Sequence, residues 1–374
     1  MLALTAALVG PYFIDWTSYR AEFEREASRV LGREVVVRGE ASARLLPFPS
    51  VTFSDVEVAG AAPGEPAMTM EAFSMDAELA PFLRGELLIF DMRLVRPRAT
   101  LAISDDGTLD WAIRPSTPFD PSQVTLEKLT VTEGQVAIRH AASGRMHELT
   151  EVNADISAKS LAGPWRIDGS TRIDGMLTRL AISTGSVDET GKMRLRVRAE
   201  PDRYAFGLEL DGDAALKEGV LSYDGAFKLT ARDGDRLRGS GGDTFVLTDG
   251  NPDTGKPQPP AYRVSGRFEI DHQAVEVPEF RFETGPLEDP YTADGHATIG
   301  LGTEPRFSIV ADGAQLRFGD ATKSGGDTSA IALATRLSAF REAVLDLPRP
   351  VIPGTIEVNL PAIVAGDTTI REMR

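Results

Sequence analysis

The segment VTFSDVEV, residues 51–58, contains the pattern that decides the fold. Val51 and Phe53 alternate, two polar spacers follow, and Val56 and Val58 alternate again. Alternation with a period of two predicts a β-strand with one apolar face, but the odd step between the two pairs would turn the second pair to the opposite face. A β-bulge at the spacers restores the facing and bends the strand. The pattern therefore predicts a curved strand whose apolar side chains share one face.

The same arrangement of two apolar pairs around two spacers recurs in three further segments. They are LLIFDMRL at residues 87–94, VTLEKLTV at residues 124–131 and VEVPEFRF at residues 275–282. The recurrence favours one bent strand unit used repeatedly, and unrelated bulged strands of a sandwich are the alternative. The residues that we predict to line the shared apolar face are Val35, Val37, Val51, Phe53, Val56, Val58, Leu87, Ile89, Met92, Leu94, Leu126, Leu129, Val131, Val275, Val277, Phe280 and Phe282.

Turn chemistry between the strands predicts hairpins. Asp-Gly between alternating apolar runs is a strong hairpin signal because both residues tolerate positive φ. Consecutive hairpins build an antiparallel sheet, and few candidate helices lie between them. We therefore predict a mainly β fold, a curved and twisted antiparallel sheet shaped as a β-groove, with an N-terminal helix and one C-terminal helix. The Asp-Gly pairs begin at Asp106, Asp168, Asp174, Asp211, Asp224, Asp233, Asp249, Asp294 and Asp312.

The first 16 residues predict part of a membrane anchor. The uncharged run MLALTAALVGPYFI makes a helix of about 21 Å, against a hydrocarbon core of about 30 Å. Aromatic residues stand at its end, as they do at a membrane interface. We interpret the run as the last part of a transmembrane helix, with a secretory signal or a buried core helix as alternatives. The anchor residues are Leu2, Leu4, Leu8, Val9, Tyr12, Phe13, Ile14 and Trp16.

A short amphipathic helix is predicted after this anchor. Tyr19, Phe23 and Ala27 fall on one helical face, and Gly32 can end the helix. Charged residues such as Glu24 are expected on the face exposed to water. We predict that this helix covers the end of the sheet that follows.

Proline, glycine and serine mark the later boundaries of the chain. The segment DGNPDTGKPQPP reads as a loop, and a Gly/Ser-rich stretch precedes apolar residues with helical spacing. We divide the chain into a partial transmembrane anchor at 1–16, a capping helix at 17–32, a repeating antiparallel β-groove at 33–320 with a possible break at 249–260, a helix at 331–346, and the start of a further, truncated β segment at 351–374.

The composition excludes several classes of function. The net charge is −16, and no Lys/Arg cluster supplies the basic face that nucleic-acid binding needs. Without cysteine the chain has no disulfide framework, thiol nucleophile or Cys-ligated zinc site. The four histidines lack a neighbouring acidic ligand set, and the common catalytic motifs are absent. We therefore predict a protein that is not an enzyme and has no metal, no cofactor and no nucleic-acid partner.

Longer stretches of the chain resemble the AsmA-like family of bacterial envelope proteins. The resemblance rests first on PYFIDWTSYR, GREVVVRGEASARLLPFPSVTFSDVEVA, ELAPFLRGELLIFDMRLVRPRATLAI and DGTLDW. Further along, GPWRIDGSTRIDG, FETGPLEDPYTADGHATIGLGTEPRFSI and GTIEVNL follow in the same order. Glycine, proline and tryptophan residues of this chain that match the pattern of the family are Gly32, Gly39, Pro47, Pro49, Gly107 and Trp111.

The resemblance implies an inner-membrane protein with one N-terminal span and its body in the periplasm. Such proteins are similar to chorein-type proteins, whose repeating β-groove carries phospholipid, and they are linked to outer-membrane assembly. The expected partners are membrane phospholipid, the inner membrane and components of outer-membrane assembly. We thus expect a protein of outer-membrane biogenesis that guides or transfers phospholipid along an apolar groove. The alternatives are a scaffold or regulator that carries no lipid and, with no motif in its favour, an envelope hydrolase. The residues alone leave open whether the apolar face is an open groove or a closed core.

Overall fold

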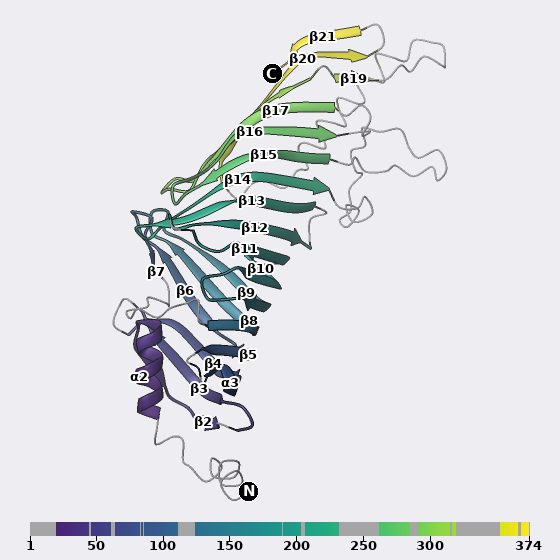
Figure 1. Ribbon diagram of the computed structural model, residues 1–374. Helices are drawn as coiled ribbons and strands as arrows, with labels where there is room; N and C mark the ends of the chain where they lie inside the picture. The colour runs from purple at the N-terminus through teal and green to yellow at the C-terminus, as the bar shows by residue number, and fades with distance from the viewer. Residues whose placement is uncertain are drawn as a thin grey trace, which may run out of the picture. The chain divides into compact units, whose positions relative to one another are not determined.

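The computed structural model describes residues 20–44, 46–60, 64–82, 84, 86–110, 124–188, 190–202, 206–231, 262–284, 291–314, 316–318, 352–365 and 368–373 (Figure 1). The chain divides into two compact units. Unit 1 comprises Met1–Arg203 and Asp211–Tyr223, and unit 2 comprises Tyr204–Leu210 and Asp224–Arg374. The described strands belong to one mixed sheet, so the mainly β prediction is confirmed.

Strands of unit 1 follow one another across the sheet. Strands β1 and β2 both pair with β3, and the order continues through β4, β5, β8, β9, β10, β11 and β12, with β6 set between β4 and β8. The elements are α2 (Arg20–Leu31), β1 (Val35–Val37), β2 (Ala41–Arg44), β3 (Ser50–Ala59), β4 (Pro66–Ala77), α3 (Leu79–Phe82), β5 (Leu87–Val95), β6 (Arg98–Ile103), β7 (Leu109–Asp110), β8 (Val124–His140), β9 (Arg145–Ala158), β10 (Trp165–Ile173), β11 (Met176–Thr184) and β12 (Lys192–Pro201).

Strands β13 (Phe206–Lys217) and β14 (Val220–Ala231) each have residues in both units. In unit 2, β15 to β18 pair in sequence, β18 and β19 both pair with β20, and β20 pairs with β21. These elements are β15 (Tyr262–Ile270), β16 (Ala274–Thr284), β17 (Tyr291–Gly300), β18 (Phe307–Gly313), β19 (Leu316–Phe318), β20 (Gly354–Ala365) and β21 (Thr368–Met373).

The predicted purely antiparallel sheet is wrong at four strand pairs. Strands β5 and β6 pair with β8 in parallel, and β18 and β19 pair with β20 in parallel. A parallel pair needs a crossover of a dozen or more residues, and the connections 104–123 and 319–353 are long enough. The Asp-Gly pairs predict only hairpins between consecutive strands, so they could not predict these parallel crossovers.

Several predicted Asp-Gly turns are also wrong. Asp106 and Asp174 do precede tight turns, with φ of 84° at Gly107 and 87° at Gly175. Five others lie inside strands. At two of them the glycine admits a close neighbour: an added Cβ would lie 2.3 Å from the Asn153 carbonyl oxygen at Gly169, and 2.1 Å from the Val310 carbonyl oxygen at Gly295. These five are Asp168, Asp211, Asp224, Asp294 and Asp312, whereas Asp233 and Asp249 lie outside the described residues.

The predicted register slip occurs at the spacers of three copies. In β8, Leu126 faces Ala158 whereas Leu129 faces Ile156, so the register shifts by one residue at the spacers. The same shift occurs in β16 between Val277 and Phe280, and between β5 and β4 beside Ile89. The first copy differs, because β3 keeps its register with β4 across the spacers and shifts only after Val58, while Asp55 adopts a φ of 50°.

The helix α2 lies within the segment predicted to be a capping helix (Figure 1). Phe23, Ala27 and Leu31 pack against the sheet. Glu24 does not face water as expected: its Oε1 accepts the Val37 N–H at 2.7 Å, and the Ser28 hydroxyl accepts the Val35 N–H at 2.9 Å. Helix side chains thereby satisfy the free edge of β1.

The other predicted terminal segments fall outside the part of the chain that the structure describes. These are the anchor at 1–16 with all its named residues, the break at 249–260 and the helix at 331–346. Among the described residues, no helix has both the length and the apolar character that a membrane span requires. The predicted further β segment at 351–374 contains β20 and β21.

Candidate functional site

Apolar side chains in unit 1 align in rows that run across the strands. Residues that face one another in the register continue from β3 to β12, over eight strands. The first row is Val51, Met75, Met92, Leu129, Ile156, Ile167, Ile182 and Val197. The second row is Phe53, Phe73, Leu94, Val131, Ala154, Gly169, Leu180 and Ala199. A third, shorter row is Ala77, Ile89, Leu126, Ala158 and Trp165. We call the surface made by these three rows the apolar face.

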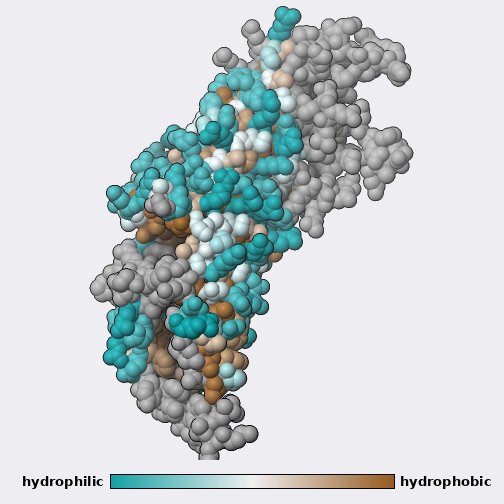
Figure 2. All heavy atoms as spheres, in the orientation of Figure 1, coloured by the Kyte–Doolittle hydropathy of each residue, from teal (hydrophilic) through white to brown (hydrophobic). Residues whose placement is uncertain are grey.

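Most of the apolar face beyond β5 is only partly buried. In β12, residues 193, 195, 197 and 199 are apolar and half-buried, while the alternate residues are charged and exposed. Ile156, Ile167 and Ile182 are half-buried in the same way. Figure 2 shows hydrophobic side chains at the surface of unit 1 near α3 and the ends of β4 and β5.

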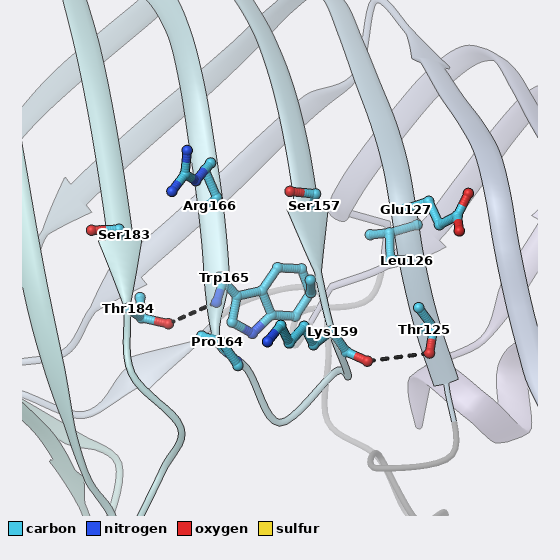
Figure 3. A pocket seen from close by; sticks show the side chains of 11 residues that line it. Thr125, Leu126, Glu127, Ser157, Lys159, Pro164, Trp165, Arg166, Ser183 and Thr184 are labelled. Carbon is cyan, nitrogen blue, oxygen red and sulfur yellow. Dashed lines mark hydrogen bonds between the residues drawn. The ribbon is translucent and has the colours of Figure 1, made fainter.

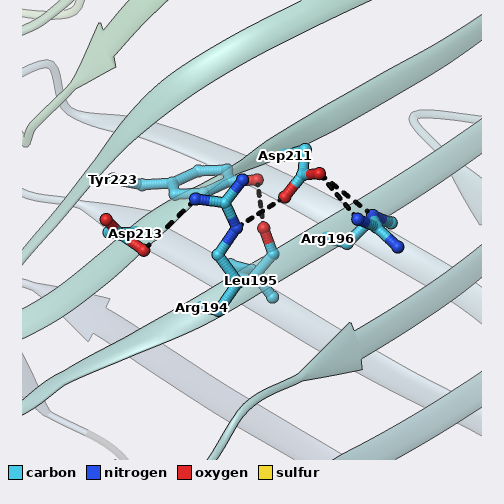
Figure 4. Close-up of polar contacts among 6 residues, drawn as sticks. All are labelled: Arg194, Leu195, Arg196, Asp211, Asp213 and Tyr223. Atoms are coloured by element: carbon cyan, nitrogen blue, oxygen red, sulfur yellow. Dashed lines mark hydrogen bonds and ion pairs between the residues drawn. The ribbon is translucent and has the colours of Figure 1, made fainter. Parts of the chain in front are cut away.

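The opposite face of β12 is held by charge pairs (Figure 4). The Asp211 carboxylate accepts hydrogen bonds from Arg196 and Arg194, both at 2.7 Å, and these two guanidinium groups lower the pKa of Asp211. The Tyr223 hydroxyl donates to the Leu195 carbonyl at 3.0 Å, and burial raises the pKa of Tyr223 to about 12. These contacts join β12 to β13 and to the start of β14.

The first copy of the strand unit is covered by α2. Val35, Val37, Phe53, Val56 and Val58 belong to one buried cluster, and Phe53 is 9% exposed. The ring of Phe23 lies edge-on to Phe53 with centroids 5.3 Å apart, and Phe73 stacks on Phe53 at 6.0 Å. These predicted lining residues therefore sit in a closed core beneath the helix.

The second and third copies lie side by side in the sheet. Leu87, Ile89, Met92 and Leu94 of β5 face Val124, Leu126, Leu129 and Val131 of β8, pair by pair and in parallel. Ile89 and Leu126 are buried, and the other predicted lining residues of these two copies are half-buried. The first copy is displaced by half a unit, because Val51 lies in the row of Met92 rather than of Leu87.

The fourth copy lies in unit 2. Val275, Val277, Phe280 and Phe282 are half-buried in β16. Phe280 faces Gly295, where an added Cβ would lie 2.6 Å from the ring, so the glycine leaves room for the aromatic side chain. Apolar partners continue from Val277 through Ala297 and Ile309 to Ile356, which is 60% exposed.

A cavity of about 460 Å³ adjoins the third row. Figure 3 shows Trp165 among hydroxyl and charged side chains from β8 to β11. The Trp165 backbone N–H donates to the Thr184 hydroxyl at 3.0 Å, and the Thr125 hydroxyl donates to the Lys159 carbonyl at 3.2 Å. The lining residues are Thr125, Leu126, Glu127, Ser157, Ala158, Lys159, Pro164, Trp165, Arg166, Ser183 and Thr184.

Sequence reasoning missed the part of the apolar face that lies beyond β8. Ile156, Ile167, Ile182 and Val197 belong to strands that alternate without the bulged spacer pattern. The signal was present, since KMRLRVRAE at residues 192–200 alternates throughout. Plain alternation predicts a strand, but it does not predict which strand will pair with it or in which register. The continuous rows were therefore visible only in the structure.

Comparison with known proteins identifies a family. A family model described as the AsmA family matches residues 1–216 of the 374. No curated protein and no solved structure matches the chain. The matched part includes α2, strands β1 to β12 and all three rows of the apolar face.

Proposed function

The chain belongs to the AsmA family, and from this premise we propose that it is an inner-membrane-anchored protein of the periplasm that guides or transfers phospholipid along its apolar face. Its partners in this proposal are membrane phospholipid, the inner membrane and components of outer-membrane assembly. The N-terminal span remains part of the proposal.

The single observation that carries the proposal is the length of the partly exposed apolar rows. Beyond the closed core beneath α2, the first two rows continue over the five strands β8 to β12, which at about 4.8 Å per step is a path of about 19 Å. An acyl chain on this path would gain about 0.8 kcal/mol for each methylene removed from water. A closed sandwich core would bury these side chains, whereas Ile167 and Ile182 stay half-buried.

The cavity beside Trp165 supports the same proposal. Its walls combine the apolar Leu126 and Trp165 with the charged Glu127, Lys159 and Arg166. Apolar and polar groups at one site suit an amphiphile, whose chain and head need different surroundings. No catalytic step is part of the proposal, because holding an acyl chain requires a dry surface and not a nucleophile.

A scaffold that carries no lipid is the second candidate. The closed core beneath α2 favours it, because part of the same strand pattern serves packing alone. In that case the protein would act on outer-membrane assembly through contact with another protein.

Native mass spectrometry of the detergent-extracted full chain separates the two candidates. We expect phospholipid to remain bound to the wild type and to be lost from the Ile167→Gln/Ile182→Gln variant, which places polar groups in the first row. Lys192→Gln is the matched control, because Lys192 is exposed on the charged side of β12. Circular dichroism verifies that all proteins are folded. A wild-type protein without lipid would contradict transfer and favour the scaffold.

A further inference from the structure

A short hairpin in unit 1 contacts a turn that lies about 110 residues further along the chain. The hairpin covers residues 104–110, contains β7, and is called the clasp below. Its Leu109 N–H donates to the Gly219 carbonyl at 2.8 Å, and Thr108 forms an isolated antiparallel bridge with Val220. Gly219 has a φ of 87°, and a Cβ added there would lie 2.9 Å from the Thr108 methyl carbon. The clasp thus rests closely on the turn between β13 and β14.

This contact joins strands that lie far apart in the sheet. The clasp pairs with β6, and β8, β9, β10, β11 and β12 follow β6 in order. The ion pair of Arg194 with Asp211 then places β13 beside β12. In a flat sheet, β6 and β13 would lie about 29 Å apart at about 4.8 Å per strand. The sheet must therefore curl round for the clasp to reach Gly219.

The side-chain exposures indicate which face lies inside the curl. Curling crowds the side chains of the concave face and spreads those of the convex face. In β12, Leu195 and Val197 are half-buried, whereas Arg194 and Arg196 are exposed. The apolar face is thus the inner face, and the clasp closes the curl that surrounds it.

The other side of the clasp is tied to the covered core. Asp110 forms an ion pair with Arg33, whose side chain is 8% exposed, and Arg33 also donates to the Ala59 carbonyl at 3.4 Å. Arg33 lies between α2 and β1. Among the described residues, the clasp is thus tied to the covered core by the ion pair of Asp110, and to the turn between β13 and β14 by an isolated bridge rather than by the long register of a strand pair.

We propose that the clasp is a lateral gate: its release from Gly219 and Val220 opens the curl, and this opening admits the acyl chains of a phospholipid to the apolar face. The inference rests on the proposed function. The gate opens at the Gly219 contact, because that contact joins strands that lie far apart in the order of the sheet. The hairpin stays tethered through Asp110 and recloses over the bound chain.

A reversible crosslink tests the gate. The chain has no cysteine, so Thr108→Cys/Val220→Cys introduces a single possible disulfide between bridge partners. Uptake is followed with the full chain and phosphatidylglycerol bearing a pyrene-labelled acyl chain in phosphatidylcholine vesicles. We expect oxidation to slow uptake at least tenfold and reduction to restore it. The control Ala137→Cys/Glu148→Cys crosslinks partners in β8 and β9, a pair that does not open, and its uptake is expected to stay unchanged.

A glycine substitution tests the gate in the opposite direction. Gly219→Ala strains the turn and pushes against Thr108, so we expect uptake and loss of the probe to become at least threefold faster. Gly175→Ala is the matched control, because Gly175 has the same φ of 87° but no atom within 4 Å of an added Cβ. Both variants carry the backbone strain, and only Gly219→Ala disturbs the clasp.

The outcomes separate the gate from the proposed function. If the wild type takes up the probe and the oxidised Thr108→Cys/Val220→Cys protein takes it up at the same rate, the gate is overturned and the proposed function is not. Equal acceleration by Gly219→Ala and Gly175→Ala also overturns it, because loss of stability would then explain the effect. A wild type that never takes up the probe overturns both the proposed function and the gate.

Discussion

Two parts of unit 1 carry the same apolar alternation and have different surroundings. Beneath α2, the strands β1 and β3 bury their apolar side chains, and Val58 is 1% exposed. From β9 to β12, side chains of the same type remain half-buried. The difference comes from the covering element and not from the strands themselves. An alternating strand becomes core only where another element packs on it, and among the described residues α2 packs on the cluster formed by β1 and β3.

The largest expected difference between the two parts is in stability. Phe53→Ala removes a ring that contacts Phe23 and Phe73, and we expect a loss of about 3–4 kcal/mol in the free energy of unfolding. Urea denaturation followed by circular dichroism measures it. A loss below about 1 kcal/mol would mean that the cluster beneath α2 is not a packed core.

The corresponding truncation on the uncovered part should cost less. Ile167 is half-buried, so Ile167→Ala forfeits only part of its transfer free energy, about 1–2 kcal/mol. The same urea titration gives the value. If Ile167→Ala proves as costly as Phe53→Ala, then the two parts do not differ and the rows beyond β5 form a closed core.

The covered part also depends on polar contacts from the helix. Glu24→Ala leaves the Val37 N–H without its acceptor, and we expect a cost of about 1 kcal/mol. Glu22→Ala is the control, because Glu22 is exposed and forms an exposed ion pair with Arg25. Hydrogen exchange at the Val37 amide should accelerate in Glu24→Ala. Unchanged exchange would show that α2 covers β1 without this bond.

The smallest effect concerns the charged side of the uncovered part. Arg196 and Arg194 lower the folded-state pKa of Asp211, so the stability they provide is present above its ordinary pKa and is lost as pH falls below about 4. Asp211→Asn should flatten this acid dependence by about 0.5 kcal/mol or less, because the pairs are largely exposed. Thermal unfolding between pH 3 and pH 7 measures it. A steeper acid dependence in Asp211→Asn would reverse the sign that we assign.

Much of the local structure could be predicted from the sequence. Alternation identified β3, β5, β8 and β16, and the odd step at the spacers identified the register shifts in three of them, because both are properties of neighbouring residues in one chain. The Asp-Gly rule failed at Asp168 and Asp294 because it considers only turns. In these strands the glycine is required by the close approach of the neighbouring strand, which leaves no room for a Cβ.

Strand character, the bulged spacers and the absence of recognisable catalytic motifs were thus determined by the sequence itself. Only the tertiary structure decided that the second and third copies pair in parallel, that the first is displaced by half a unit, that α2 closes one part of the apolar face, and that the clasp reaches Gly219. The physical reason is range: side-chain alternation acts over two residues, whereas pairing and covering join residues tens of positions apart, such as Leu87 and Val124, and the clasp contact joins Leu109 to Gly219, more than a hundred positions away.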